Sequence, residues 1–274
     1  MEKGVTCVVP ARLGSTRFFG KLLQPLRGKP VVVHALERAA EAACFEQVIC
    51  FTDSVEIAEA VAAHGFAYAL TGDADNGTER IARHLAALPT LSIGEEPHLI
   101  VNLQGDEPAF PVEGLRTLCA ALRQQPDFVH ILVHNDAPST TDLENPNRVK
   151  VVLDAQGIVQ DFVRVPETVG AQGGLTPSST ATTYRLQLGA YGYSRTYLTG
   201  YAALPRSARE IELSHEILRA APQQRGWAPV QAHFSEPGAS VDVPADLVSA
   251  LHALNKTPHK TTHKPQRTLQ GILS

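Results

Sequence analysis

The chain has 274 residues, of which 43% are hydrophobic and 19% charged, so it can bury a sizeable core and is neither a disordered chain nor a peptide scaffold. Its 24 Lys and Arg against 28 Asp and Glu give a net charge of −4, without the basic excess of a nucleic-acid-binding protein. The four cysteines are far apart and no apolar run reaches the roughly 18 residues of a membrane span. We therefore expect reduced thiols and a cytoplasmic protein without a nucleic-acid or membrane partner.

The first half of the chain alternates short apolar strands with amphipathic helices. This pattern predicts a mostly parallel sheet covered on both faces, with ligands at the carboxyl ends of the strands. The expected strands are Val5–Val9, Gln47–Phe51, Phe66–Leu70 and His98–Leu103, and the expected helices are Val31–Ala43, Val55–Ala63 (capped by Asp53 or Ser54), Thr78–Leu88 and Val112–Arg123.

After Arg123 the pattern changes to strands joined by turns, which predicts an antiparallel arm inserted over about residues 128–195. A loop rich in Gly, Ser and Thr, Val169–Thr183, is expected to be mobile. We assign residues 1–254 to a single domain and residues 255–274, with four basic and no acidic side chains, to a disordered tail. The strands expected in this half are Phe128–Val133, Val149–Leu153, Ile158–Val163, Leu186–Tyr193 and Val230–Phe234, and the helices are Ala208–Ala220 and Ala245–Leu254.

The loop that follows the first strand, Pro10–Lys21, combines three cationic side chains with two hydroxyls and two glycines. Cations and free backbone N–H groups in one loop are typical of a polyphosphate site. The loop does not match the P-loop pattern, because Leu22 stands where Ser or Thr is required, nor the dinucleotide pattern G-x-G-x-x-G. A solvated basic loop is the alternative interpretation.

Two acidic residues are candidate magnesium ligands. Asp106 follows the most apolar strand, and Asp242 precedes the last expected helix. Mg²⁺ is commonly held by one or two carboxylates together with substrate phosphates. Either residue could instead be a turn or helix-cap residue.

Six segments together resemble the 3-deoxy-manno-octulosonate cytidylyltransferase family, also called CMP-Kdo synthetases, in order and spacing. They are Pro10–Lys21, Gly77–Arg80, Gln104–Pro108, Asn145–Lys150, Gly189–Tyr193 and Val241–Pro244. The resemblance implies a three-layer α/β/α nucleotidyltransferase fold, Rossmann-like, with a mostly parallel sheet and an antiparallel arm. It also implies a homodimer and a reaction in which an acceptor oxygen attacks the α-phosphorus of CTP and pyrophosphate leaves.

Carried onto this chain, the resemblance implies that Arg12, Lys21 and Asp106 are catalytic and that Asp106 and Asp242 bind Mg²⁺. The nucleotide would contact Ala11, Arg12, Ser15, Arg17, Lys21, Gly77, Thr78, Arg80, Gln104 and Asp106. The acceptor would contact Gln104, Arg164, Gln187 and Tyr191.

The acceptor half departs from the family pattern. Gln187 replaces a histidine of the family, Ser194 replaces an arginine, and Arg164 is retained without the second cation. A small phosphonate, which arrives already anionic, is therefore the alternative to a sugar acid such as 3-deoxy-manno-octulosonate. A non-catalytic nucleotide-binding protein is a third interpretation, but it would be expected to lack Lys21 or one of the two aspartates.

Overall fold

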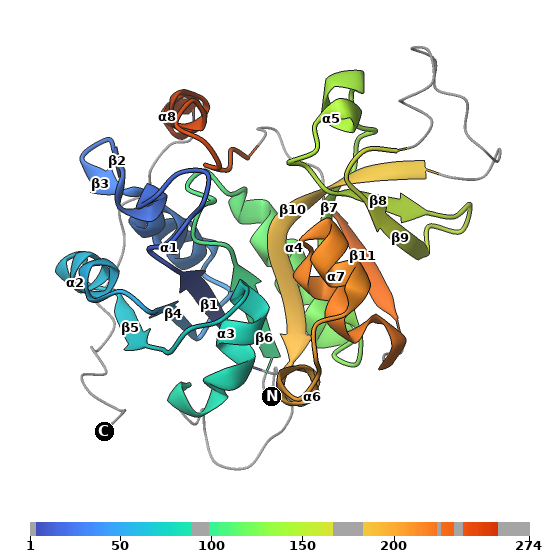
Figure 1. Cartoon of the computed structure of the whole chain (residues 1–274), viewed down its shortest axis with the longest axis horizontal. Coiled ribbons are helices and arrows are strands. Elements are labelled where there is room, and N and C mark those ends of the chain that lie inside the picture. Colours follow the sequence, from blue (N-terminus) through green and yellow to red (C-terminus); the bar gives the residue numbers. More distant parts are fainter. Residues whose placement is uncertain (1–3, 89–98, 167–182, 224–225, 233–237, 257–274) are drawn as a thin grey trace.

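The computed structural model describes residues 4–88, 99–166, 183–223, 226–232 and 238–256, and shows a large mixed sheet between helices together with a separate two-stranded sheet (Figure 1). The spatial order of the main sheet is β11-β7-β10-β6-β1-β4-β5, and β8 and β9 extend from β10. The strands are β1 (Val5–Ala11), β2 (Pro25–Leu26), β3 (Lys29–Pro30), β4 (Gln47–Thr52), β5 (Ala67–Leu70), β6 (Leu99–Leu103), β7 (Val129–His134), β8 (Lys150–Leu153), β9 (Val159–Val163), β10 (Thr183–Ser194) and β11 (Trp227–Ala232).

Parallel pairing dominates the main sheet. β1 pairs in parallel with β4 and β6, β4 with β5, and β7 with β11, whereas β10 runs antiparallel to β6 and β7. The long β10 continues out of the main sheet to pair with β8, which pairs in turn with β9. The arm predicted over about residues 128–195 is thus divided, because β7 and the second half of β10 lie inside the main sheet.

Helices lie on both faces of the sheet (Figure 1). Within the described residues, no helix is both long and apolar enough to cross a membrane. The α-helices are α1 (Val31–Ala42), α2 (Val55–Ala63), α3 (Gly77–Arg83), α4 (Val112–Gln124), α5 (Thr140–Glu144), α6 (Arg195–Ala202), α7 (Ala208–Leu213) and α8 (Asp246–Lys256), and the 3-10 helices are η1 (Lys21–Leu23), η2 (Leu85–Ala87) and η4 (Glu216–Gln223).

The sheet separates two hydrophobic cores, and β1 contributes to both because its side chains alternate. Val5, Cys7 and Val9 pack with α1, α4 and α8, whereas Val8 points to the opposite core, formed with α3, α6 and η4. Both faces of β1 are therefore covered, which explains its continuous apolar sequence. This arrangement confirms the predicted three-layer α/β/α class.

Three local predictions need correction or refinement. β1 does not end before Pro10 but continues to Ala11, because β6 pairs only as far as Val8 and requires no N–H from Pro10. Ser54 rather than Asp53 caps α2, by accepting a hydrogen bond from the backbone of Ile57. The helix expected at 208–220 is two elements, α7 and η4, because Ser214 adopts a left-handed conformation with φ of 47°.

Two short helices, α5 and α6, were not expected from the sequence. The predicted mobile loop lies outside the described residues except for Thr183, which begins β10. The predicted tail also lies outside them, except that residues 255 and 256 are the last two residues of α8.

Candidate active site

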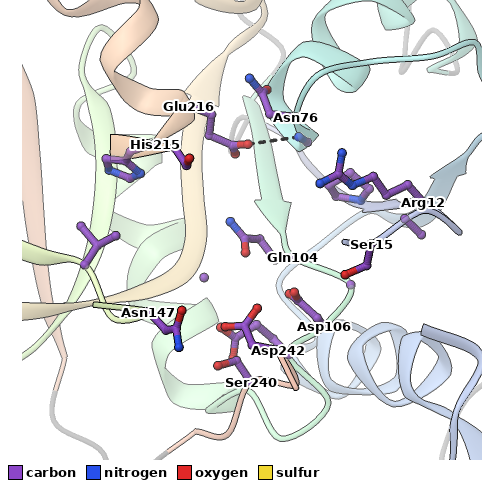
Figure 2. A pocket seen from close by; sticks show the side chains of 18 of the residues that line it. Arg12, Ser15, Asn76, Gln104, Asp106, Asn147, His215, Glu216, Ser240 and Asp242 are labelled. Atoms are coloured by element: carbon purple, nitrogen blue, oxygen red, sulfur yellow. Dashed lines mark hydrogen bonds between the residues drawn. The ribbon is translucent and has the colours of Figure 1, made fainter. Parts of the chain in front are cut away.

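A cavity of about 490 Å³ opens at the carboxyl ends of β1 and β6 (Figure 2). It lies where the topology of an open α/β sheet favours ligand binding. Thr78 does not line it, because this residue is fully buried behind the cavity wall. The predicted site residues that line the cavity are Ala11, Arg12, Ser15, Arg17, Lys21, Gly77, Arg80, Gln104, Asp106, Arg164, Gln187, Tyr191 and Asp242.

At one end of the cavity, two carboxylates converge on Lys21. Its Nζ lies 2.5 Å from Oδ2 of Asp106 and 3.3 Å from Oδ1 of Asp242. Arg17 binds the same Asp242 oxygen at 2.8 Å and Asn147 at 2.7 Å. Segments from opposite ends of the chain therefore form one charged cluster.

The charges in this cluster shift the pKa of its neighbours. Burial alone would lower the pKa of Lys21, but Asp106 and then Asp242 outweigh it and raise this pKa. Burial, followed by the charges of the same two carboxylates, raises the pKa of Glu107 to about 8. The cavity thus contains the ammonium group of Lys21 beside a cluster of acidic side chains, and this cluster favours the binding of a cation.

Close backbone packing brings the loop after β1 to this cluster. A Cβ at Gly105 would lie 3.1 Å from the carbonyl oxygen of Pro10, so glycine lets the end of β6 approach the end of β1. Arg12 and Ser15 extend into the cavity from the β1 side, opposite Gln104 at the end of β6 (Figure 2). Cationic and hydroxyl groups therefore face the cavity from one side, as the sequence predicted for Pro10–Lys21.

The first turn of α3 is bound by a half-buried carboxylate, that of Glu216. Its Oε2 accepts a hydrogen bond from the backbone N–H of Gly77 at 3.1 Å, and its Oε1 accepts one from the hydroxyl of Thr78 at 2.8 Å. Asn102 donates to Oε1 at 3.2 Å. The N–H of Gly77 and the hydroxyl of Thr78 are thus already engaged, so Gly77 lines the cavity wall and Thr78 supports it from behind.

Arg80 is also engaged within the protein. Its Nη2 lies 2.6 Å from Asp53, and its Nη1 donates to the carbonyl of Gly72 and to the hydroxyl of Thr71. The guanidinium is only 3% exposed, although Arg80 contributes to the cavity lining. It fixes the segment after β5 against the end of β4.

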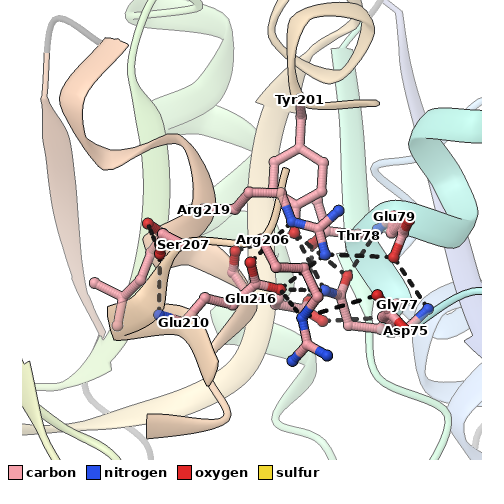
Figure 3. A network of polar contacts seen from close by, with 12 residues as sticks. Asp75, Gly77, Thr78, Glu79, Tyr201, Arg206, Ser207, Glu210, Glu216 and Arg219 are labelled. Atoms are coloured by element: carbon pink, nitrogen blue, oxygen red, sulfur yellow. Dashed lines mark hydrogen bonds and ion pairs between the residues drawn. The ribbon is translucent and has the colours of Figure 1, made fainter. Parts of the chain in front are cut away.

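A polar network supports α3 from behind (Figure 3). Arg219 binds Glu210 through two hydrogen bonds of 2.8 and 2.9 Å, and reaches Glu79 at 3.3 Å. Asn76 caps α3 by accepting from the backbone of Glu79, and donates to Glu210 at 2.9 Å. The guanidinium of Arg219 also lies 4.7 Å from the ring centre of Tyr201, so η4, α6, α7 and α3 are held together.

Arg164, which the sequence predicts to contact an acceptor, joins two segments of the cavity wall. Its guanidinium donates to the carbonyls of Leu213 at 2.9 Å, Ser214 at 3.0 Å and Asn147 at 3.2 Å. The buried Lys150 donates in turn to the carbonyl of Arg164 and to two carbonyls of the loop before β8. Arg164 is therefore largely committed to holding the cavity wall, although it lines the cavity.

Gln187 and Tyr191, each predicted from the sequence to contact an acceptor, contact each other. The side-chain amide of Gln187 donates to the hydroxyl of Tyr191 at 2.6 Å. His215, whose ring centre lies 6.4 Å from that of Tyr191, lines the same cavity. Oε1 of Gln187 and Nε2 of His215 are buried and have no hydrogen-bond partner within the described part of the chain. Burial lowers the pKa of His215 to about 3, so its imidazole is neutral at physiological pH.

Four further residues line the cavity that were not assigned to the site from the sequence, namely His215, Glu216, Glu107 and Asn147. The signal for the first two is the polar stretch Ser214–Glu216 within an expected amphipathic helix. The break at Ser214, which turns these side chains toward the cavity, has no comparable sequence signal.

Taken with the sheet topology, the lysine held between two carboxylates and the cationic loop beside it define a nucleotidyltransferase. Residues 6–219 match the cytidylyltransferase family, and the chain belongs to that family. Its activity class is therefore that of an enzyme transferring a cytidylyl group.

The chain is similar over nearly its whole length to enzymes named 3-deoxy-manno-octulosonate cytidylyltransferase, which confirms the resemblance drawn from the six segments. It is 34% identical to the enzyme of Anaeromyxobacter sp., over 93% of this chain and 99% of that protein. It is 33% identical to the enzyme of Syntrophotalea carbinolica, over 89% of this chain and 96% of that protein. A solved structure of CMP:2-keto-3-deoxy-manno-octonic acid synthetase complexed with CTP shares 30% identity and a TM-score of 0.77, covering 93% and 99% of the two chains.

Proposed function

We propose that this enzyme transfers the cytidylyl group of CTP, in the presence of Mg²⁺, to 3-deoxy-manno-octulosonate or a related sugar acid and releases pyrophosphate. The observation that carries the proposal is the position of Lys21, held between Asp106 and Asp242 beside the cationic loop. Transfer at phosphorus requires in-line positioning and charge neutralisation more than covalent help from the protein. This cavity supplies fixed charge of both signs.

The loop after β1 is proposed to bind the triphosphate of CTP. Arg12, Ser15, Arg17 and Lys21 present cations and a hydroxyl to the cavity, and so can neutralise the departing pyrophosphate. The tightly held first turn of α3, with Gly77 facing the cavity, supplies a rigid wall for the base. Because the guanidinium of Arg80 donates to Asp53 and to the Thr71–Gly72 segment, Arg80 acts by positioning this wall.

The two aspartates fit Mg²⁺. Both offer carboxylate oxygens, the donor type that Mg²⁺ prefers, and both converge on one ammonium ion. No cluster of three or more ligating side chains occurs among the described residues. Two carboxylates completed by phosphate oxygens and water are sufficient for this ion, which would neutralise charge on the α-phosphate and pyrophosphate.

The acceptor half is proposed to bind a polyhydroxylated acid through Gln104, Gln187, Tyr191 and His215. Oε1 of Gln187 and Nε2 of His215 are buried polar atoms that lack a partner, and buried polar atoms of this kind are usually hydrogen-bonded. Hydroxyl groups can both donate and accept, so a sugar acid can satisfy both atoms. Arg164 completes the wall and leaves part of its guanidinium for the carboxylate.

A small phosphonate is the second candidate acceptor. It is favoured by the amide of Gln187, which cannot take a proton from an attacking hydroxyl, and by the low basicity of the buried His215. A phosphonate oxygen is already anionic and needs no base. In this alternative, the unpartnered atoms of Gln187 and His215 would remain without a hydroxyl partner.

The experiment is pyrophosphate release from CTP and Mg²⁺ with a panel of 3-deoxy-2-ulosonic acids and small phosphonates, with UTP as the control nucleotide. Release that depends on an ulosonic acid and on CTP supports the proposal. Release only with a phosphonate would identify a phosphonate as the acceptor in place of a sugar acid. If no acceptor increases the release of pyrophosphate, the assigned reaction is refuted. A homodimer also belongs to the proposal, and sedimentation at equilibrium tests it.

A further inference from the structure

Two thiols meet where α1 packs against α4, outside the lining of the cavity. Cys44 lies two residues after the end of α1, and Cys119 lies within α4. Their sulfur atoms are 3.1 Å apart, although 75 positions separate them along the chain. Cys44 is half-buried and therefore reachable from solvent, whereas Cys119 is fully buried behind it.

The turn that carries Cys44 is fixed to the helix that carries Cys119. Arg123 of α4 donates to the carbonyl of Cys44 at 3.0 Å, and Arg116 of α4 donates to the carbonyl of Ala42 at 3.0 Å. The sulfur atoms need to approach by only about 1 Å to reach bonding distance. Small side-chain rotations can provide this movement while both backbone anchors stay in place.

The two sulfur atoms also differ in chemical character. The Cys119 thiol lowers the pKa of Cys44 by hydrogen bonding to its thiolate, and Arg123 and Arg116 lower it further against the effect of burial. The pKa of Cys119 is raised by its hydrogen bond with Cys44 and by burial. Cys44 therefore has the properties of an attacking thiolate and Cys119 those of a resolving thiol.

We propose that Cys44 and Cys119 form a reversible, peroxide-sensitive dithiol that joins α1 to α4. The Cys44 thiolate attacks one oxygen of a hydroperoxide, the O–O bond breaks, and the departing oxygen leaves as water or an alcohol after taking up a proton. The resulting sulfenic acid is attacked by the sulfur of Cys119, which loses its proton as water departs and the disulfide forms. Two electrons pass from the thiols to the peroxide, and a dithiol reductant reverses the change.

The disulfide would leave the cavity intact. Along the same helix pair, Arg38 of α1 already donates to the carbonyl of Phe110, just before α4, at 3.0 Å. The new bond therefore adds a covalent link between helices that hydrogen bonds already join. By closing a long loop it should raise the unfolding midpoint of the oxidised protein.

The test treats the full chain with hydrogen peroxide and measures the intact mass, then blocks free thiols and identifies the cross-linked peptides. The expected result is a loss of about 2 Da, a peptide linking Cys44 to Cys119, and reversal by dithiothreitol. Cys44→Ser and, separately, Cys119→Ala should abolish the link. Cys50→Ser is the matched control, because burial raises the pKa of Cys50 to about 12, and this variant should keep the link.

Two further readouts complete the test. The oxidised protein should unfold at a higher temperature than the reduced protein and retain its rate of pyrophosphate release within about twofold. The absence of the Cys44–Cys119 peptide from the treated parent chain, or its survival in Cys44→Ser, would overturn the proposal. Conversion of Cys44 to a sulfinic acid without a cross-link would also overturn it.

Discussion

Replacing Lys21 by glutamine is expected to slow turnover by roughly 10³-fold. The Lys21 side chain is only 13% exposed and lies between two carboxylates in the cavity wall. In such a partly buried site, with an effective dielectric constant of about 20, a unit charge about 4 Å from developing charge contributes about 4 kcal/mol. A loss of about 4 kcal/mol in transition-state stabilisation corresponds to roughly 10³ in rate.

The assay is the rate of acceptor-dependent pyrophosphate release at saturating CTP and Mg²⁺. Lys29→Gln is the matched control, because Lys29 forms an ion pair of the same 2.5 Å length with Glu37 outside the lining of the cavity. This control should retain the parent rate. A Lys21→Gln enzyme within about threefold of the parent would refute the role given to this ammonium ion.

Three other predictions concern the metal, the acceptor and pH. Asp106→Asn and Asp242→Asn should each abolish Mg²⁺-dependent turnover. If both variants reach nearly the parent rate when Mg²⁺ is titrated, neither aspartate is a metal ligand. Gln187→His should change the ratio of kcat/KM between acceptors while KM for CTP stays nearly constant, so an unchanged ratio excludes Gln187 as an acceptor contact. Because the folded pKa of His215, about 3, is below the unfolded value of about 6.5, its neutral form stabilises the fold above pH 6.5. The free energy of unfolding should fall by up to about 1.4 kcal/mol per pH unit as pH decreases toward 3. Denaturant titrations of His215→Phe should show a weaker dependence of this free energy on pH. The same pH dependence in the variant and the parent would contradict the lowered pKa of His215.

The sequence was most informative where apolar strands end in polar residues. The carboxyl ends of β1 and β6 were recognisable before the structure, and they do place Ala11 and Gln104 on one cavity. This succeeds because a buried parallel strand requires a continuous apolar run, and the chain must become polar where it leaves the sheet. The position of Asp242 depended on the resemblance, since its local sequence equally suits a turn.

The arm and the acceptor wall were less predictable because both depend on contacts distant in sequence. β7 and β10 have strand-like sequences, but their place in the main sheet is set by pairing with β11 and β6. Arg164 was expected to be available to an acceptor, whereas its donors largely serve the carbonyls of distant loops. The hydrogen bond between Glu216 and the first turn of α3 likewise joins residues more than a hundred positions apart in the sequence.

In the proposed reaction, an acceptor oxygen attacks the α-phosphorus of CTP. The most direct measurement follows CTP labelled at the α-phosphorus during incubation with Mg²⁺ and 3-deoxy-manno-octulosonate. The label is expected in a cytidylylated acceptor, in a quantity equal to the pyrophosphate released. Label found only in free CMP, or pyrophosphate released at the same rate without any acceptor, would contradict it.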